Sequence, residues 1–357
     1  MDHGARQKRL TNECKALDIN ALLVTHMPNV RYLTGFTGSA GVLVATQRPI
    51  FTTDGRYREQ ASQQVQRARV VVGKGSALAS AIDAIRKAKI RRVGIEADHI
   101  TVATRRTLSR ELGRSVKLVD TSAVVEKFRI IKDADEIRLI RKAVDLGSNL
   151  LPVVCRALKP GRTEASVAAH LEFAARERGA EAMSFETIVA AGARSALPHG
   201  VASAARVARR GFVVLDYGVI LNGYCSDMTR TVCIGRATSE QRRVYAAVLE
   251  AQLAAIAAVA PGRTAGDVDE AARSVLKRAG LDRYFIHSTG HGVGLEIHES
   301  PRVAARQKDL LQPGMVITIE PGVYIGGKYG VRIEDMVLVT ERGSEVLTRA
   351  PKVLLEL

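Results

Sequence analysis

The sequence predicts an α/β protein of two domains, and three features lead to this prediction. Short β-branched segments alternate with helical segments over residues 1–124, as they do in α/β domains. The letters Pro-Gly-Arg-Thr occur at 160–163 and again at 261–264, each time between helical segments, which indicates a duplicated half-domain with a pseudo-twofold axis. The dipeptide Asn222-Gly223 lies between two apolar runs and predicts a β-hairpin in the second domain.

The first domain, residues 1–124, is expected to consist of short helices and strands in alternation. Its one irregular stretch, 29–41, is rich in glycine and is predicted to be a turn. No Lys-Ser or Lys-Thr pair follows these glycines, so the turn does not have the sequence of a phosphate-binding loop. Helices are predicted at 5–17, 58–66 and 77–89, and strands at 21–24, 42–45, 50–53, 70–72 and 92–95.

The second domain, residues 125–357, is expected to begin with a long helix whose N-cap is Asp133. A helical segment follows each copy of the repeated tetrapeptide, and apolar strands follow each of these helices. Helices are predicted from Asp133 to about Leu151, at 164–178 and at 265–278, and strands on both sides of Asn222-Gly223, at 315–320 and at 330–339.

The composition excludes several classes of protein. Hydrophobic residues make up 46% of the 357 residues and charged residues 25%, as in ordinary soluble proteins. No apolar run approaches the ~20 residues of a membrane span, and no stretch near Met1 has the form of a signal peptide. The four cysteines show no C-x-x-C spacing, so a reduced, cytoplasmic protein is expected.

The net charge of +16 is of the kind found in nucleic-acid-binding proteins. The basic residues are nevertheless scattered along the chain, and the chain has no Trp and only 4% aromatic residues to stack against bases. A solvated, arginine-rich surface accounts for the same charge. Nucleic acid is therefore disfavoured as a partner.

The predicted hairpin brings two aspartates onto one face of a ribbon. With Asn222-Gly223 as the turn, Asp216 lies opposite Thr229 and diagonal to Asp227. Two solvated aspartates on an exposed face would be the ordinary interpretation. The apolar residues around both aspartates indicate buried strands, however, and buried carboxylates need a cation between them.

Three histidines follow in a glycine-rich segment, at His287, His291 and His298. A single histidine is more often a hydrogen-bonded polar residue than a ligand. Three within twelve residues, with glycines on both sides of His291 that allow close backbone approach, favour a ligand role.

Two glutamates complete the set of candidate ligands. Glu320 ends an apolar strand just before a Pro-Gly turn, and Glu334 is predicted to share one face of a strand with Arg332. Carboxylates with one imidazole form a hard, oxygen-rich set, which suits a pair of divalent cations better than a structural zinc ion. The other members of the set are Asp216, Asp227 and His291.

The order and spacing of these residues resemble the pita-bread metallopeptidases, a family that includes aminopeptidase P, prolidase, methionine aminopeptidase and the metal-free creatinase. Residues 29–39 and 53–57 also resemble the small creatinase-like domain of aminopeptidase P and prolidase, so the resemblance covers nearly the whole chain. Methionine aminopeptidase lacks that domain and creatinase lacks the metal ligands, which disfavours both. The second domain is matched through Asp216, Asp227, Gly290-His291-Gly292, Glu320-Pro321-Gly322 and Arg332-Ile333-Glu334.

The resemblance implies a creatinase-like first domain, a pita-bread second domain and two divalent metal ions. Asp227 and Glu334 would bridge the two metals. Asp216 would complete one site, and His291 and Glu320 the other. Manganese is the metal typical of the family, with cobalt and zinc as alternatives.

The resemblance also implies hydrolysis of the bond between any residue and a following proline, by a metal-activated water that Glu320 orients. His199 and His298 match histidines that contact the substrate, and Arg332 is expected to fix a carboxylate. Because proline has no N–H for a peptidase to grip, attack centred on a metal suits it. A small peptide with proline in second position is the expected substrate.

Arg302 matches a prolidase arginine that clamps the free carboxylate of a dipeptide, which favours an Xaa-Pro dipeptidase. An ordinary surface arginine explains Arg302 equally well, so an Xaa-Pro aminopeptidase acting on longer peptides stays open. A non-catalytic basic binding module on the same fold is a more distant alternative. By resemblance, the small domain is expected to gate the site and to support a homodimer.

Overall fold

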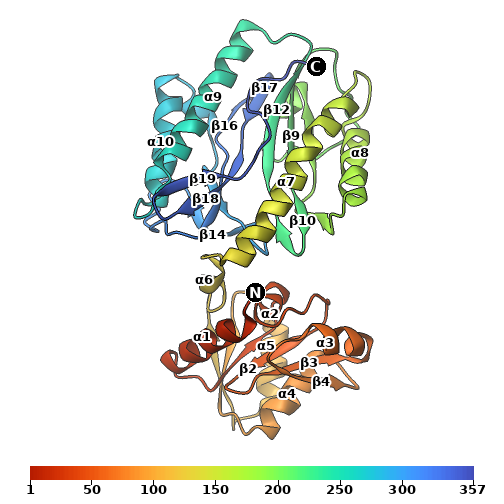
Figure 1. Ribbon diagram of the computed structural model, residues 1–357, viewed down its shortest axis with the longest axis vertical. Coiled ribbons are helices and arrows are strands. Elements are labelled where there is room, and N and C mark those ends of the chain that lie inside the picture. The colour runs from red at the N-terminus through yellow and green to blue at the C-terminus, as the bar shows by residue number, and fades with distance from the viewer. The chain divides into compact units, whose positions relative to one another are not determined.

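The computed structural model describes every residue of the chain, 1–357, and the chain divides into two compact units. The first unit comprises Met1–Arg129 and the second Ile130–Leu357. The boundary predicted from the sequence, after residue 124, lies close to this division. Figure 1 shows the helices and strands of the first unit in red to orange and those of the second in yellow to blue.

The N-terminal unit contains a mixed six-stranded sheet with helices packed against it. The sheet has the order β4-β3-β2-β1-β5-β6, and its central strand β1 pairs antiparallel with β2 and parallel with β5. In chain order the elements are α1 (His3–Ala16), β1 (Ala21–Val24), α2 (Met27–Thr34), β2 (Val42–Ala45), β3 (Ile50–Asp54), α3 (Arg58–Gln64), β4 (Arg69–Gly73), α4 (Ala77–Lys87), β5 (Arg92–Glu96), α5 (Val102–Leu112), β6 (Lys117–Thr121) and α6 (Glu126–Arg129).

The helices and strands predicted for this unit are all present, but the predicted turn at 29–41 is wrong over its first part. Residues up to Thr34 belong to α2, which has Pro28 in its first turn and ends at Gly35, whose φ is +81°. Val30 and Leu33, three residues apart, bury one face of this helix. The glycines that suggested a turn end the helix and follow it. The elements α5, β6 and α6 were not among those predicted.

The C-terminal unit is built from helix pairs and antiparallel sheets. Its sheets have the orders β12-β9-β8, β11-β10-β7, β14-β13-β15-β18-β19 and β16-β17. In chain order the elements are α7 (Ala134–Ala157), α8 (Glu164–Glu177), β7 (Ala182–Met183), β8 (Ile188–Ala191), β9 (Gly211–Tyr217), β10 (Val219–Leu221), β11 (Tyr224–Cys225), β12 (Met228–Ile234), α9 (Ser239–Ala258), α10 (Ala265–Arg278), β13 (Gly290–Gly292), β14 (Glu299–Val303), β15 (Val316–Ile319), β16 (Gly322–Ile325), β17 (Tyr329–Arg332), β18 (Asp335–Thr340) and β19 (Gly343–Val346).

The two Pro-Gly-Arg-Thr copies have the same local structure, which agrees with the predicted internal repeat. Their glycines both have a positive φ, +87° at Gly161 and +80° at Gly262. Their threonines are both helix N-caps, Thr163 for α8 and Thr264 for α10. Each copy also forms the same pattern of backbone hydrogen bonds to a later segment, 205–207 for the first copy and 309–311 for the second.

The two helix pairs cover different strands, so the strands lie in the middle of the unit. Apolar side chains of α7 and α8 pack with those of β8, β9 and β12, whereas α9 and α10 pack with β15, β17 and β18. In Figure 1, α9 and α10 lie to one side of the strands and α8 to the other. The predicted N-cap Asp133 is present and forms a capping box with Glu136.

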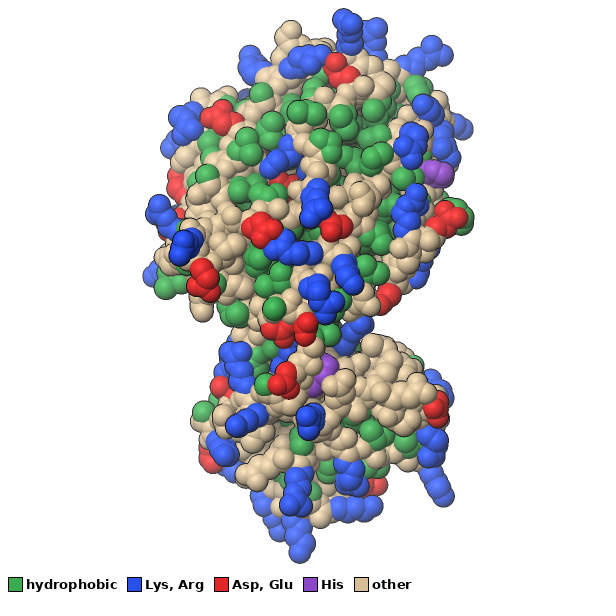
Figure 2. All heavy atoms as spheres, in the orientation of Figure 1, with side chains coloured by type: hydrophobic (Ala, Val, Ile, Leu, Met, Phe, Trp, Pro, Cys, Tyr) green, Lys and Arg blue, Asp and Glu red, His purple; other side chains and the backbone are tan.

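The net positive charge is unevenly divided along the chain. Residues 1–129 contain 23 Lys and Arg against 11 Asp and Glu, whereas residues 130–357 contain 30 against 26. On the face seen in Figure 2, Lys and Arg side chains are spread over both units and interspersed with acidic ones. None of the helices is both long and apolar enough to cross a membrane.

Candidate metal centre

Asp216 and Asp227 come from neighbouring segments of the predicted ribbon. β9 pairs antiparallel with β12 in the register expected from the Asn222-Gly223 turn, so Asp216 lies opposite Thr229. Asp227 directly precedes β12, and both aspartates are buried. The turn chemistry therefore fixes the register that brings the two carboxylates to one place.

The ribbon is interrupted between its two halves, although the sequence suggests continuous strands. β10 and β11 form a separate sheet with β7, and Gly218 marks the break. A Cβ atom on Gly218 would lie 1.8 Å from the carbonyl oxygen of Ser226, so a residue with a side chain cannot be accommodated there without a shift. This close approach lets the ribbon change sheets just beside Asp227.

The other candidate ligands come from the second half of the unit. His291 is the middle residue of β13, and Glu320 directly follows β15. Glu334 lies between β17 and β18, so the prediction that Arg332 and Glu334 share one strand is wrong. The hairpin formed by β16 and β17 is a sheet of its own, and the chain crosses to another sheet between Arg332 and Asp335.

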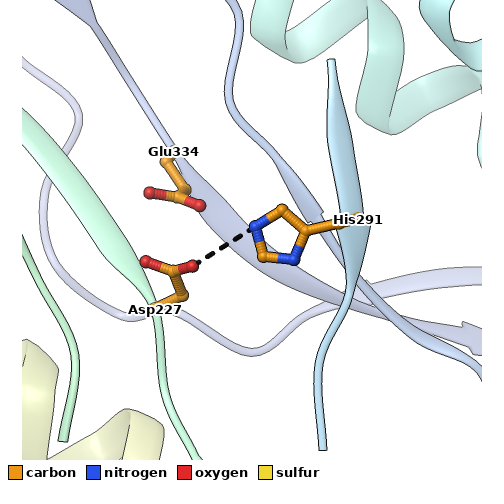
Figure 3. Close-up of side chains that lie close together, drawn as sticks. All are labelled: Asp227, His291 and Glu334. Carbon is orange, nitrogen blue, oxygen red and sulfur yellow. Dashed lines mark ion pairs between the residues drawn. The ribbon is translucent and has the colours of Figure 1, made fainter. Parts of the chain in front are cut away.

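Three of these side chains point toward one another in Figure 3. One ligand atom each from Asp227, His291 and Glu334 lies within 4.8 Å of the others. The Nε2 atom of His291 is 3.6 Å from an oxygen of Asp227 and 3.6 Å from an oxygen of Glu320. These separations leave room for a cation between the donor atoms.

The carboxylates of this cluster repel one another, and several of their oxygens lack hydrogen-bond partners in the protein. One buried oxygen of each of Asp216, Asp227 and Glu334 has no hydrogen-bond partner. Burial and the neighbouring carboxylates raise the pKa values of Asp227 and Glu334 well above their ordinary range. Burial also raises the pKa of Glu320 to about 7. Unpaired buried carboxylate oxygens of this kind fit divalent metal ions.

His291 is held in the form that can bind a metal. Its Nδ1 is 3.0 Å from the carbonyl oxygen of Gly292, which can only accept, so Nδ1 carries the proton and the lone pair of Nε2 faces the carboxylates. Burial lowers the pKa of this imidazole to about 4, so it is neutral at pH 7.

Arg332 is buried and ties several parts of the cluster together. Its guanidinium donates to Asp216 Oδ2 at 2.5 Å and to the hydroxyl of Thr229 at 3.1 Å. It also donates to the hydroxyl of Tyr324 at 2.7 Å and to the carbonyl oxygen of Pro198 at 3.0 Å. The Thr229 hydroxyl in turn donates to Glu334 Oε2 at 2.8 Å.

His287 orients the Tyr324 hydroxyl that accepts a hydrogen bond from Arg332. The Nδ1 atom of His287 is 2.7 Å from the carbonyl oxygen of Ser288 and therefore carries the proton. Its Nε2 then accepts from the Tyr324 hydroxyl at 2.9 Å, which leaves the Tyr324 oxygen to accept from Arg332. Burial lowers the pKa of His287 to about 4, which keeps it neutral in this role.

The predicted substrate-contacting residues lie at the rim of the cluster. The ring of His298 packs against His291 with 4.4 Å between centroids. Burial and the charge of His199 lower the pKa of His298. Both are exposed, as is Arg302, which lies directly opposite His291 on the neighbouring strand.

The sequence did not reveal the roles of Thr229, Tyr324 and His287. Thr229 could have been found from the register, since it lies opposite Asp216 beside a candidate ligand. Tyr324 and His287 are 37 residues apart in the sequence and meet only in the folded chain. No local pattern signals such a contact.

Comparisons with known proteins agree with this description. Residues 138–341 match metallopeptidase family M24, and residues 6–131 match the creatinase/prolidase N-terminal domain. The Xaa-Pro dipeptidase of Pyrococcus horikoshii is 37% identical over 340 residues, which cover 94% of this chain and 95% of that protein. A solved Xaa-Pro dipeptidase from Bacillus anthracis is 39% identical with a TM-score of 0.96, and both chains are covered completely.

A related structure has a different printed activity. The X-Pro aminopeptidase of Thermotoga maritima is 34% identical with a TM-score of 0.91, over 99% of this chain and 100% of that one. The chain therefore belongs to metallopeptidase family M24. It has the creatinase-like first domain and the pita-bread second domain that the sequence predicts.

Proposed function

We propose that this protein is an Xaa-Pro dipeptidase that acts through two divalent metal ions. The observation that carries the proposal is the buried cluster of Asp227, His291 and Glu334, with unpaired carboxylate oxygens and a neutral imidazole facing one another. The high similarity to proteins named Xaa-Pro dipeptidase over nearly their full length supports the choice of substrate.

Five residues would hold the metals in this proposal. Asp227 and Glu334 would bridge them, Asp216 would complete one site, and His291 and Glu320 would complete the other. Manganese is the proposed metal, because carboxylate ligands suit it and one imidazole is compatible with it, while cobalt and zinc stay as alternatives. When bound, such ions lower the pKa of a water molecule and polarise the scissile carbonyl group.

The chain's own residues would orient the substrate and move protons. Glu320, whose carboxylate lies 3.6 Å from His291 Nε2, would orient the attacking water and pass its proton to the departing proline nitrogen. His199 and His298 are exposed, and His298 packs against His291, so these two histidines would donate to the carbonyl oxygen of the substrate. Arg332 would keep Asp216 in place rather than touch the substrate.

Arg302 is proposed to bind the free carboxylate of the dipeptide. It lies opposite His291 on an antiparallel strand, so the two side chains emerge on the same face, and its guanidinium is exposed. A planar guanidinium suits bidentate binding of a carboxylate. A longer peptide would place an amide where this carboxylate lies, so the position of Arg302 favours a dipeptide over the substrates of an aminopeptidase.

Hydrolysis of Ala-Pro and Ala-Pro-Ala tests this choice. The wild-type protein is expected to prefer Ala-Pro, and Arg302→Ala is expected to lose Ala-Pro turnover while any turnover of Ala-Pro-Ala is unchanged. Arg306→Ala, another exposed arginine a few residues away, is the matched control and should alter neither rate. Faster turnover of Ala-Pro-Ala by the wild type would favour an Xaa-Pro aminopeptidase instead.

The remaining parts of the proposal concern the setting of the enzyme. We propose a cytoplasmic homodimer in which the N-terminal domain, residues 1–124, gates the site formed by residues 125–357. The four free cysteines, Cys14, Cys155, Cys225 and Cys233, suit a reducing compartment. Light scattering tests the dimer. DNA binding at physiological salt without peptidase activity would favour a basic binding module.

A further inference from the structure

The backbone of Glu334 does not take part in the hydrogen bonding of either neighbouring strand. It follows β17 and precedes β18, outside both strand ladders. Its backbone N–H donates to the carbonyl oxygen of Thr229 at 3.1 Å, and one carboxylate oxygen accepts from the Thr229 hydroxyl. Its backbone carbonyl needs a further partner, because a buried carbonyl group without one is costly.

The side chain of Arg230 supplies that partner. Arg230 is 2% exposed and donates to the carbonyl oxygen of Glu334 at 2.5 Å and to that of Thr229 at 2.9 Å, both from Nη1. Its Nη2 donates to Asp335 Oδ1 at 2.7 Å and to the carbonyl oxygen of Ala350 at 2.8 Å. Its Nε donates to the carbonyl oxygen of Pro351 at 2.9 Å. All five N–H groups of this guanidinium are therefore used.

Only arginine can make these contacts together. The ammonium group of a lysine carries its three donors on one atom, so it cannot reach the five acceptors that surround the planar guanidinium. The buried positive charge is balanced by Asp335, which is fully buried as well. The second oxygen of Asp335 accepts from Gln252 at 2.8 Å and from Lys352 at 2.7 Å, so the ion pair is itself fixed from the other side.

The position of this network points to a role in the site rather than in packing alone. Arg230 contacts the backbone of Glu334 and of Thr229, and Thr229 orients the Glu334 carboxylate. The same guanidinium contacts Ala350 and Pro351, more than a hundred residues from Arg230 in the sequence. A displacement of the Arg230 guanidinium would therefore move the Glu334 carboxylate.

We propose that Arg230 is a positioning residue of the metal centre, which fixes the Glu334 peptide and couples it to the C-terminal segment Ala350–Lys352. The inference rests on the proposed two-metal function, in which Glu334 is a ligand. Replacing a residue that holds a metal ligand in place, without itself binding the metal, commonly weakens metal affinity about 10–100-fold.

The test is the affinity of the chelated protein for Mn²⁺, measured by titration calorimetry for the wild type and for Arg230→Lys. Arg230→Lys keeps the positive charge but loses the planar guanidinium. It is expected to lower the Mn²⁺ affinity of at least one metal site by about 10–100-fold. Arg194→Lys is the matched control, because it loosens another arginine ion pair to a buried carboxylate of the same unit, that with Glu164, and the hydrogen bonds of Arg194 go to Glu164 and Val201 and not to Glu334, Thr229 or Asp335. It is expected to leave both Mn²⁺ affinities at their wild-type values, even if its melting temperature falls.

The outcomes separate this inference from the proposed function. Wild-type Mn²⁺ affinity in Arg230→Lys would overturn the role of Arg230, as would equal weakening in both variants, which is the result of a general loss of stability. A wild-type protein that binds no metal would overturn the proposed function itself. If Arg230→Lys does not fold, Asp335→Asn loosens the same guanidinium: weaker Mn²⁺ binding then supports the role, and unchanged binding overturns it.

Discussion

Metal ions should stabilise this protein strongly above pH 7 and weakly at lower pH. Burial and mutual repulsion raise the pKa values of Asp227 and Glu334, and burial raises that of Glu320 to about 7. A carboxyl group with a raised pKa stabilises the folded chain while it is protonated, and this stabilisation is lost as the pH rises through the folded-state pKa. Above about pH 6.5 the metal-free protein should therefore become less stable as the pH rises through about 7, the raised pKa of Glu320.

His291 does not reverse this trend in that range. Its pKa is lowered to about 4 by burial, so the stability that comes from its neutral form is complete above the ordinary histidine value of about 6.5 and is lost only as the pH falls toward 4. Above about pH 6.5 only the carboxylates titrate, so the stability of the metal-free protein falls as the pH rises.

The size of the effect follows from the three buried carboxylate oxygens without partners. A buried polar group left unsatisfied costs about 1–3 kcal/mol, so satisfying three of them should contribute at least about 3 kcal/mol. For a unit of the length of Ile130–Leu357, 1 kcal/mol of stability corresponds to about 2–4 °C in melting temperature. Saturating Mn²⁺ should therefore raise the melting temperature by at least about 6 °C at pH 8.

Differential scanning calorimetry of the chelated protein, with and without Mn²⁺, Co²⁺ or Zn²⁺, measures this difference across the pH range. Asp227→Asn is the informative control, because it removes one of the repelling charges. Its metal-free form should melt above the metal-free wild type at pH 8 and should gain little from added metal. A melting temperature that none of these metals changes at any pH would refute the reasoning.

Three substitutions give further tests. Thr229→Val keeps a β-branched side chain but removes the hydroxyl that orients Glu334, and calorimetric titration should show metal binding about tenfold weaker or worse with the fold intact by circular dichroism. Glu320→Gln removes a ligand and a proton carrier, so kcat for Ala-Pro should fall by at least about 10²-fold, and a rate near that of the wild type would exclude the proposed role. Gly218→Ala places a Cβ against the carbonyl oxygen of Ser226, and chemical denaturation should report a loss of about 1–3 kcal/mol, whereas unchanged stability would contradict the close approach.

Local signals in the sequence were enough to predict part of the candidate site. The turn residues Asn222-Gly223 set the register of the ribbon, and the register alone places Asp216 opposite Thr229. The repeat at Pro160 and Pro261 indicated the duplicated half-domain because its conformation depends on a glycine with positive φ and a threonine cap, which are properties of a few adjacent residues.

Features that depend on distant parts of the chain could not be predicted. Glu334 lies off its predicted strand because the chain changes sheets there, and the ribbon breaks at Gly218 because β10 and β11 pair with β7 instead. The hydrogen bond from Arg230 to Ala350 spans 120 residues. Alternation along a strand says which face a residue occupies, but it does not say where the strand stops pairing.

The rate of Ala-Pro hydrolysis during stepwise return of Mn²⁺ to chelated protein tests the two-metal centre most directly. If Asp216, Asp227, His291, Glu320 and Glu334 hold two metals that drive the reaction, turnover should be absent before metal is added and should reach its maximum when two ions are bound per chain. Full turnover by protein shown to be metal-free by elemental analysis would contradict the proposed function.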